Sequence, residues 1–363
     1  MDDIKFNMYR QAGDIVNLTL DKAKELCQLK YKASYICTFC DAIMSESLKK
    51  GFKKVEKGIA LPLCLSVNNI VGHRTYTTED DYQLKDGDIV KLELACHIDN
   101  NVATIGDTIK IGDDKWEESD LMTAAKKALE IGIKFMNPDT DIYKFENILK
   151  KVASCFDLNI IERPNNNLDD EKLLYDWIFR DTDKFNEPSW HIKSEHELML
   201  EDDELDSEEI YINEMITPRQ AYHISVAFCK GDSKCKLSEE NSLLFQKTIN
   251  RCNLKSKYAR ELITKVEQNY DTEIFKINSI DMGETRTKMG IKECLEKKVL
   301  RNLPIIEAKT DEIVYLKCTL VVQNNSIYKL TGPKYNFQTH DKLSEELNKI
   351  IIKSSKFDKR EDV

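Results

Sequence analysis

Residues 87–112, with the sequence GDIVKLELACHIDNNVATIGDTIKIG, decide the fold of this chain. Within this stretch two apolar, β-rich runs, 89–98 and 102–111, flank a short polar link, DNN, at residues 99–101. Two such runs joined by turn-forming residues predict a β-hairpin.

The first run carries charged and polar side chains on one of its faces. Side chains alternate along a strand, so Lys91, Glu93 and His97 point away from the apolar residues between them. An acidic residue inside a buried strand needs a cationic partner or a metal ion, because an unpaired buried charge is costly. The residues alone leave both alternatives open for Glu93, a paired structural carboxylate or a metal ligand.

The composition indicates a soluble globular protein of 363 residues, with 41% hydrophobic and 33% charged side chains. No run of 18 apolar residues predicts a membrane span, and the N-terminus, MDDIKFNMYR, lacks the pattern of a signal peptide. Eleven cysteines without a framework spacing are typical of a reducing compartment. We therefore expect a cytoplasmic protein without a membrane partner, and leave the nucleus and nucleolus open.

Two further features limit the function classes. The formal net charge of −10 argues against nucleic-acid binding by the whole surface. Cys37 and Cys40 form a single CxxC motif, whereas a zinc site needs four ligands. We expect these two cysteines to be buried helix residues.

A family resemblance enters at the hairpin and at residues 66–73, SVNNIVGH. Both stretches resemble the start of the catalytic half of type II methionine aminopeptidases. They are still more similar to the non-peptidase relatives of those enzymes, the proliferation-associated, ribosome-binding proteins, as is MGIKEC at 289–294. The resemblance extends over about residues 5–347.

The resemblance implies one α/β pita-bread domain over residues 1–363. Two pseudo-symmetric halves, about 1–160 and 161–363, would share a central antiparallel sheet backed by helices, and a basic helical insert would span about 236–302. From the residue patterns we expect helical structure over 4–57, two amphipathic helices at 120–134 and 139–156, and mostly helical structure over 238–298. Strands are expected at 63–71, 222–228, 313–322 and 327–330.

In the peptidases five side chains hold two metal ions, and the resemblance places those positions on Glu93, Thr104, Asn167, Ser225 and Lys317. Only Glu93 keeps a ligand's negative charge, and Lys317 brings a positive one. We therefore expect no metal and no cofactor, and hypothesise that Lys317 neutralises Glu93.

Two details of the former site depend on the hairpin and its surroundings. If the hairpin pairs about Asn100, Glu93 and Thr104 lie on opposite faces, so we expect a β-bulge that returns them to one face. His73 matches a substrate-contacting histidine of the peptidases. The alternative for His73 is a hydrogen-bonded structural histidine.

Two basic stretches are candidates for RNA binding. The first, which we call the lysine arm, is residues 48–57 and contains Lys49, Lys50, Lys53, Lys54 and Lys57. The second lies in the insert, where residues 230–301 hold sixteen Lys/Arg against eleven Asp/Glu, a local +5. Its candidate residues are Lys255, Lys257, Arg260, Arg286 and Lys288, the last two in an expected loop. Ordinary solvated surface is the alternative for both stretches, and for the acidic block 201–209, which could also contact a basic protein.

The resemblance implies a catalytically inactive protein that docks on the large ribosomal subunit near the peptide exit tunnel, through rRNA and exit-tunnel proteins, without a small-molecule substrate. Two alternatives remain. One is an active metallo-aminopeptidase that removes initiator methionine. The other is a protein-interaction or signalling adaptor that does not bind ribosomes.

Overall fold

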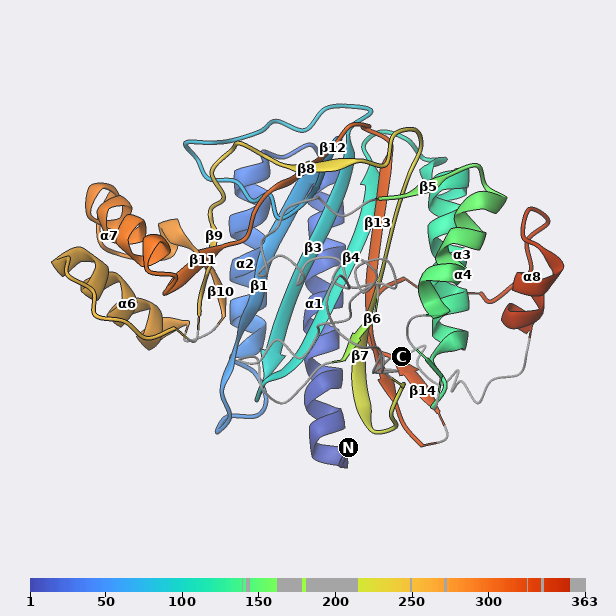
Figure 1. Cartoon of the computed structure of the whole chain (residues 1–363), viewed down its shortest axis with the longest axis horizontal. Helices are drawn as coiled ribbons and strands as arrows, with labels where there is room; N and C mark the ends of the chain where they lie inside the picture. The colour runs from blue at the N-terminus through green and yellow to red at the C-terminus, as the bar shows by residue number, and fades with distance from the viewer. Residues whose placement is uncertain are drawn as a thin grey trace, which may run out of the picture.

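The computed structural model describes residues 1–138, 140–141, 144–161, 178–180, 215–248, 250–270, 273–324, 326–333 and 336–352. Its centre is an antiparallel sheet with the strand order β1-β3-β4-β13-β7-β5, to which β14 adds at β13 and β6 at β7 (Figure 1). The bounds are Lys57–Val67 (β1), Ile89–Ile98 (β3), Asn101–Lys110 (β4), Asn159–Ile160 (β5), Ile178–Arg180 (β6), Gln220–Cys229 (β7), Ile313–Val322 (β13) and Ile327–Lys329 (β14).

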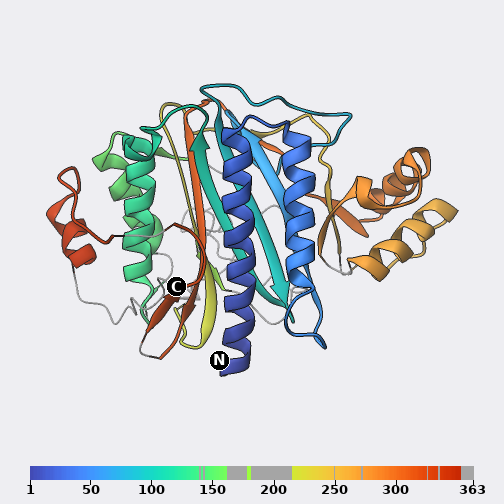
Figure 2. The same cartoon turned by 180° about the vertical axis from the view of Figure 1, so that it is seen from behind.

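Helices cover one face of this sheet. Two of them pack against β1, β3 and β4, on the side that faces the viewer in Figure 2, and two pack against β7 and β13. Their bounds are Asp3–Gln28 (α1), Ala33–Leu48 (α2), Asp120–Phe135 (α3) and Lys144–Cys155 (α4), and α8, Glu345–Ile352, packs beside α3. Among the described residues no helix is long and apolar enough to cross a membrane.

The N-terminal helical region is shorter than the sequence predicted. Asp2 caps α1 by accepting a hydrogen bond from the Lys5 backbone at 2.7 Å, and α2 ends at Leu48. Residues 49–56 are not helical, and β1 begins at Lys57. The expected strand at 63–71 is divided into β1 and β2 (Ile70–Gly72). Both cysteines of the CxxC motif are buried in α2, as predicted.

The hairpin is confirmed, but its turn has two residues rather than three. Asp99 and Asn100 have φ angles of 52° and 59°, which the tight type I′ turn requires and Asp and Asn tolerate. The register runs without a shift from Ile98↔Asn101 to Ile89↔Lys110.

This register corrects the prediction of a bulge between β3 and β4. Ala95 lies opposite Thr104, and Glu93 lies opposite Gly106, so Glu93 and Thr104 already share one face. The prediction centred the turn on Asn100, and a shift of one residue reverses the faces of a whole strand. The bulges of this region lie between β1 and β3 instead.

Threonine hydroxyls join β4 to β13, where the two halves meet. The Thr108 hydroxyl accepts from the Tyr315 N–H and donates to the Tyr315 carbonyl, both at 2.8 Å. In the same way the Thr319 hydroxyl bridges the N–H and carbonyl of Thr104, both at 2.9 Å. Between these two bridges the strands pair directly at Lys317↔Gly106.

We expect Thr319→Val to lower the free energy of unfolding by about 1–3 kcal/mol, because it leaves the buried Thr104 N–H without an acceptor. Thr108→Val should lower the free energy of unfolding in the same way, because it leaves the Tyr315 N–H without an acceptor. Urea denaturation measures both, with Thr264→Val on an exposed helical site as the control, expected to stay within about 0.5 kcal/mol of the wild type. Equal stability of all three variants would show that the bridges contribute nothing.

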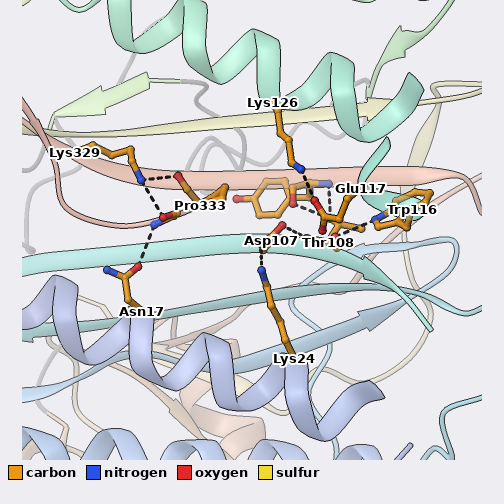
Figure 3. A network of polar contacts seen from close by, with 11 residues as sticks. Asn17, Lys24, Asp107, Thr108, Trp116, Glu117, Lys126, Lys329 and Pro333 are labelled. Atoms are coloured by element: carbon orange, nitrogen blue, oxygen red, sulfur yellow. Dashed lines mark hydrogen bonds and ion pairs between the residues drawn. The ribbon is translucent and has the colours of Figure 1, made fainter. Parts of the chain in front are cut away.

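Polar side chains also fasten the chain after β14 to α1 (Figure 3). Asn17 donates to the Leu330 carbonyl at 2.9 Å and accepts from the Gly332 N–H at 3.1 Å. Lys329 donates to the carbonyls of Gly332 and Pro333 at 2.9 and 2.7 Å. Elements from both ends of the chain are thus held together.

The insert is a mixed α/β unit, so the prediction of a mostly helical segment was wrong. A three-stranded sheet, β10-β9-β11, packs against two helices at the edge of the molecule beyond β1 (Figure 1). The bounds are Leu244–Lys247 (β9), Lys257–Asn269 (α6), Ile274–Lys276 (β10), Glu284–Glu296 (α7) and Leu300–Asn302 (β11). These strands have three or four residues, which is too short for the period-2 pattern to be visible in the sequence. A further sheet of β2, β12 (Ile306–Ala308) and β8 (Cys235–Leu237) lies at one end of the central sheet.

Candidate functional site: an ion pair across the central sheet

Four of the five positions matched to metal ligands meet on the face of the central sheet that the helices do not cover. Three of these positions lie in one row across the sheet: Glu93 on β3, Lys317 on β13 and Ser225 on β7. Gly106 on β4 lies in the same row, between Glu93 and Lys317. Thr104 lies two residues from Gly106 on the same face. The fifth position, Asn167, lies outside the described residues.

Lys317 forms an ion pair with Glu93, as hypothesised from the sequence. Its Nζ lies 2.8 Å from Glu93 Oε1, and the Tyr315 hydroxyl donates to the same oxygen at 3.2 Å. Both Glu93 and Lys317 are largely shielded, with side-chain exposures of 9% and 14%. The carboxylate therefore has a cation and a phenol as partners inside the protein.

The glycine between these two strands makes the contact possible. A Cβ atom on Gly106 would lie only 3.0 Å from Lys317 Cβ and from the Tyr315 ring. Because Gly106 has no side chain, Lys317 and Tyr315 on β13 can reach across β4 to Glu93 on β3. Three strands thus contribute to one polar cluster.

The ion pair controls the charge state of Glu93. Burial alone would raise the pKa of this carboxyl, but Lys317, the nearby His73 and the hydrogen bonds from Lys317 and Tyr315 together lower it. Glu93 is therefore ionised at neutral pH, and its charge is balanced by Lys317.

The two histidines at the site are uncharged at neutral pH. Burial lowers the pKa of His73, although Glu93 and a hydrogen bond to the Pro304 carbonyl oppose this. His73 Nδ1 lies 3.1 Å from that carbonyl oxygen and so carries the proton, since a carbonyl can only accept. Burial, together with Lys317, places the pKa of His223 well below its ordinary value, and His223 Nδ1 lies 3.0 Å from the Thr319 hydroxyl.

These residues do not fit a two-metal centre. Such a centre needs several carboxylates to hold two divalent cations roughly 3.5–4 Å apart. At an effective dielectric of about 20, Lys317 would repel a divalent ion 4 Å away by about 8 kcal/mol. Nor do the described residues hold any group of three His, Cys, Asp or Glu side chains arranged to bind a metal.

The lysine arm lies at the surface, as the RNA-binding interpretation requires. Lys49, Lys50, Lys53 and Lys54 are exposed, whereas Lys57 is partly buried. Lys49 pairs with Glu46, and Lys57 donates to the Gly51 carbonyl at 3.1 Å. Lys53 and Lys54 have no partner among the described residues.

The candidate residues of the insert lie on two helices. Lys255, Lys257 and Arg260 are exposed around the start of α6. Arg286 and Lys288 lie in the first half of α7, so the expectation of a loop was wrong, and Lys288 pairs with Glu284. The sequence pattern missed this helix start because Gly283, at φ 75°, supplies no capping side chain.

An ion pair and a histidine–carboxylate contact that sequence reasoning missed fasten the insert to α2 and to the central sheet. Lys276 on β10 pairs with Asp41 on α2, and Glu273 pairs with His97 on β3. Asp41 also accepts from the Leu63 N–H at 2.8 Å. No local pattern marks these partners, which lie 176 or more residues apart in the chain.

Comparisons with known proteins bear on the fold and on the family resemblance. A family model described as metallopeptidase family M24 matches residues 7–162. ERBB-3 binding protein 1 of Arabidopsis thaliana is 27% identical over 334 residues, which cover 89% of this chain and 79% of that protein. Proliferation-associated protein A of Dictyostelium discoideum is 26% identical over 343 residues, or 90% and 82% of the two chains.

The fold is matched by a solved structure. The match to the structure of a thermophilic Arx1 covers 98% of this chain and 99% of the Arx1 chain, with a TM-score of 0.79 at 22% sequence identity. The chain therefore has the pita-bread fold, and over about nine-tenths of its length it is similar to ERBB-3 binding protein 1 and proliferation-associated protein A.

Proposed function

We propose that this protein binds the large ribosomal subunit near the peptide exit tunnel and has no aminopeptidase activity. The observation that carries the second part is the ion pair between Lys317 and Glu93, which occupies the one carboxylate left at the former metal centre. A divalent ion bound to this carboxylate would lie beside the Lys317 ammonium, and the repulsion between the two cations opposes its binding. The first part rests on the resemblance to the ribosome-binding proteins and on the basic surfaces.

Both basic surfaces suit contact with phosphates. The lysine arm and the start of α6 present exposed lysines and an arginine on a protein whose overall charge is −10. Folded RNA is recognised mainly through its backbone and shape, so such surfaces can bind rRNA without reading its sequence. We place the protein in the cytoplasm, with access to the nucleus and nucleolus.

The docking proposal predicts co-sedimentation with large ribosomal subunits that weakens steeply with salt. Lys53→Glu/Lys54→Glu removes two phosphate contacts, so the slope of log K against log salt should fall by roughly 2. The control is Lys144→Glu/Lys150→Glu on α4, which makes the same charge change at the opposite end of the molecule (Figure 1). Equal binding by both double variants would remove the lysine arm from the interface, and no binding by the wild type would end the proposal.

The absence of peptidase activity is tested separately. Purified protein dialysed against Mn²⁺, Co²⁺ or Zn²⁺ should retain less than one equivalent of metal and release no methionine from a Met-Ala-Ser peptide. Two bound equivalents with methionine release would instead establish the active aminopeptidase.

A further inference from the structure

We propose that a pocket at the end of α6 takes one unpaired guanine base of the bound RNA. The inference rests on the proposed function, because it names a contact within the RNA-facing insert. The pocket has a volume of about 490 Å³ and is lined by the last turn of α6 and by residues 279–281. Its size lies within the range of roughly 300–1,000 Å³ found for small-molecule sites.

Two polar residues that line the pocket, Asp281 and Gln268, are exposed, and neither side chain has a partner among the described residues. Beside them the Lys265 ammonium donates to the Asp281 carbonyl oxygen. The pocket thus offers an anionic acceptor, a neutral amide and a cation within one hollow.

This set of groups matches the Watson–Crick edge of guanine. Guanine presents two adjacent donors, N1–H and N2–H₂, to which a carboxylate can accept in bidentate fashion, and an O6 acceptor for an amide N–H or an ammonium. Uracil places two carbonyl oxygens around a single N–H, so the Asp281 carboxylate would repel it. Adenine and cytosine each offer one donor beside an unprotonated ring nitrogen.

An aromatic wall for the base is already in place. The Tyr270 ring stacks on Phe275 with a centroid separation of 5.0 Å, and its hydroxyl lies 2.7 Å from the Ser279 hydroxyl. Unpaired bases in RNA complexes are held by stacking on such rings together with hydrogen bonds to their edges. Since both contacts fix Tyr270 before any ligand binds, little ordering is needed on binding.

The position of the pocket connects it to the lysine arm. Glu273, three residues after Tyr270, pairs with His97. Its carboxylate also lies so close to Gly58, the residue after Lys57, that a Cβ atom on Gly58 would clash with it. A single strand with its phosphates on the lysine arm would therefore pass close to the pocket. The Asp281 carboxylate repels the phosphates of a bound RNA. Its favourable contact with RNA is therefore with hydrogen-bond donors on the edge of a base.

The experiment measures fluorescence anisotropy of labelled ten-nucleotide RNAs, one all uridine and one with a single central guanosine. We expect the wild-type protein to bind the guanosine RNA about tenfold more tightly, the discrimination that a good bidentate contact gives. Asp281→Asn should reduce this preference to less than about twofold and leave the affinity for the all-uridine RNA unchanged or slightly higher. The exposed Glu296→Gln, at the end of α7, is the matched control and should keep the preference.

Each outcome decides one claim. Equal affinity of the wild-type protein for both RNAs, or a preference that survives Asp281→Asn, would overturn the guanine site. An equal preference for a central adenosine would show stacking without edge recognition and would also overturn it. If ribosome co-sedimentation persists in those cases, only this inference fails, whereas loss of co-sedimentation by the wild type removes the proposed function itself.

Discussion

Lys317→Ala is expected to lower the free energy of unfolding by about 3–5 kcal/mol, because it leaves the buried Glu93 carboxylate without its cation. Tyr315 would remain as a hydrogen-bond donor but carries no charge to balance the anion. Urea denaturation at pH 7 measures the loss. The control is the double variant Glu93→Gln/Lys317→Met, which removes both charges and should recover most of the lost stability.

The pH dependence of the same variant separates an ion pair from simple packing. In the wild type the pKa of Glu93 is lower in the folded state than in the unfolded chain. Its contribution to stability is therefore present above the unfolded pKa and lost as pH falls through the folded one. In Lys317→Ala the carboxyl keeps its burial and loses the cation, so its folded pKa should rise above the unfolded value.

The sign of the Glu93 contribution then reverses, and mild acid should stabilise the variant relative to pH 7. A Lys317→Ala protein with unchanged stability at pH 7, or with the wild-type pH profile, would contradict a stabilising pair between these residues.

The sequence allowed this pair to be predicted because the charge reversal at Lys317 occurs at a position that a family resemblance places beside Glu93. The turn of the hairpin was missed although the sequence holds a signal for it: only a two-residue link sets Ala103, Ile105 and Ile109 opposite the apolar face of 89–98. The positive φ angles of Asp99 and Asn100 fit this tight turn. The strands of the insert were missed because tertiary pairing, and not a local pattern, makes three or four residues a strand.

Burial of a charged residue was the other feature that sequence could not supply. Lys91 lies on the same face of β3 as Glu93, where a solvated lysine would be ordinary, yet it is only 2% exposed. Its Nζ donates to the backbone carbonyl of Asn68 and lies 3.5 Å from that of Ile89. Asp311, which is far from Lys91 in the sequence, also acts on its charge, so the environment of Lys91 depends on the folded structure.

Lys91 should make stability rise with pH above neutrality. Burial lowers its pKa from 10.5 to about 7, although Asp311 and Asp88 oppose the shift. Between these two values the unfolded chain binds a proton that the folded protein does not, so stability increases with pH by up to about 1.4 kcal/mol per unit. Over the whole interval the effect amounts to about 3–5 kcal/mol. This gain in stability is fully present above the pKa of Lys91 in the unfolded chain and is lost below its pKa in the folded protein.

The measurement is the difference in unfolding free energy between the wild type and Lys91→Met from pH 6 to 8.5. Buried thiols such as Cys40, whose pKa burial raises to about 12, destabilise the fold at higher pH, but they are common to both proteins and cancel. We expect Lys91→Met to be relatively most stable at pH 6 and to lose that advantage as the pH rises. The exposed Lys115→Met should show no such trend. A flat difference for Lys91→Met would mean that the ammonium stays protonated in the folded protein, held by the carbonyls and by Asp311 and Asp88 strongly enough to offset its burial.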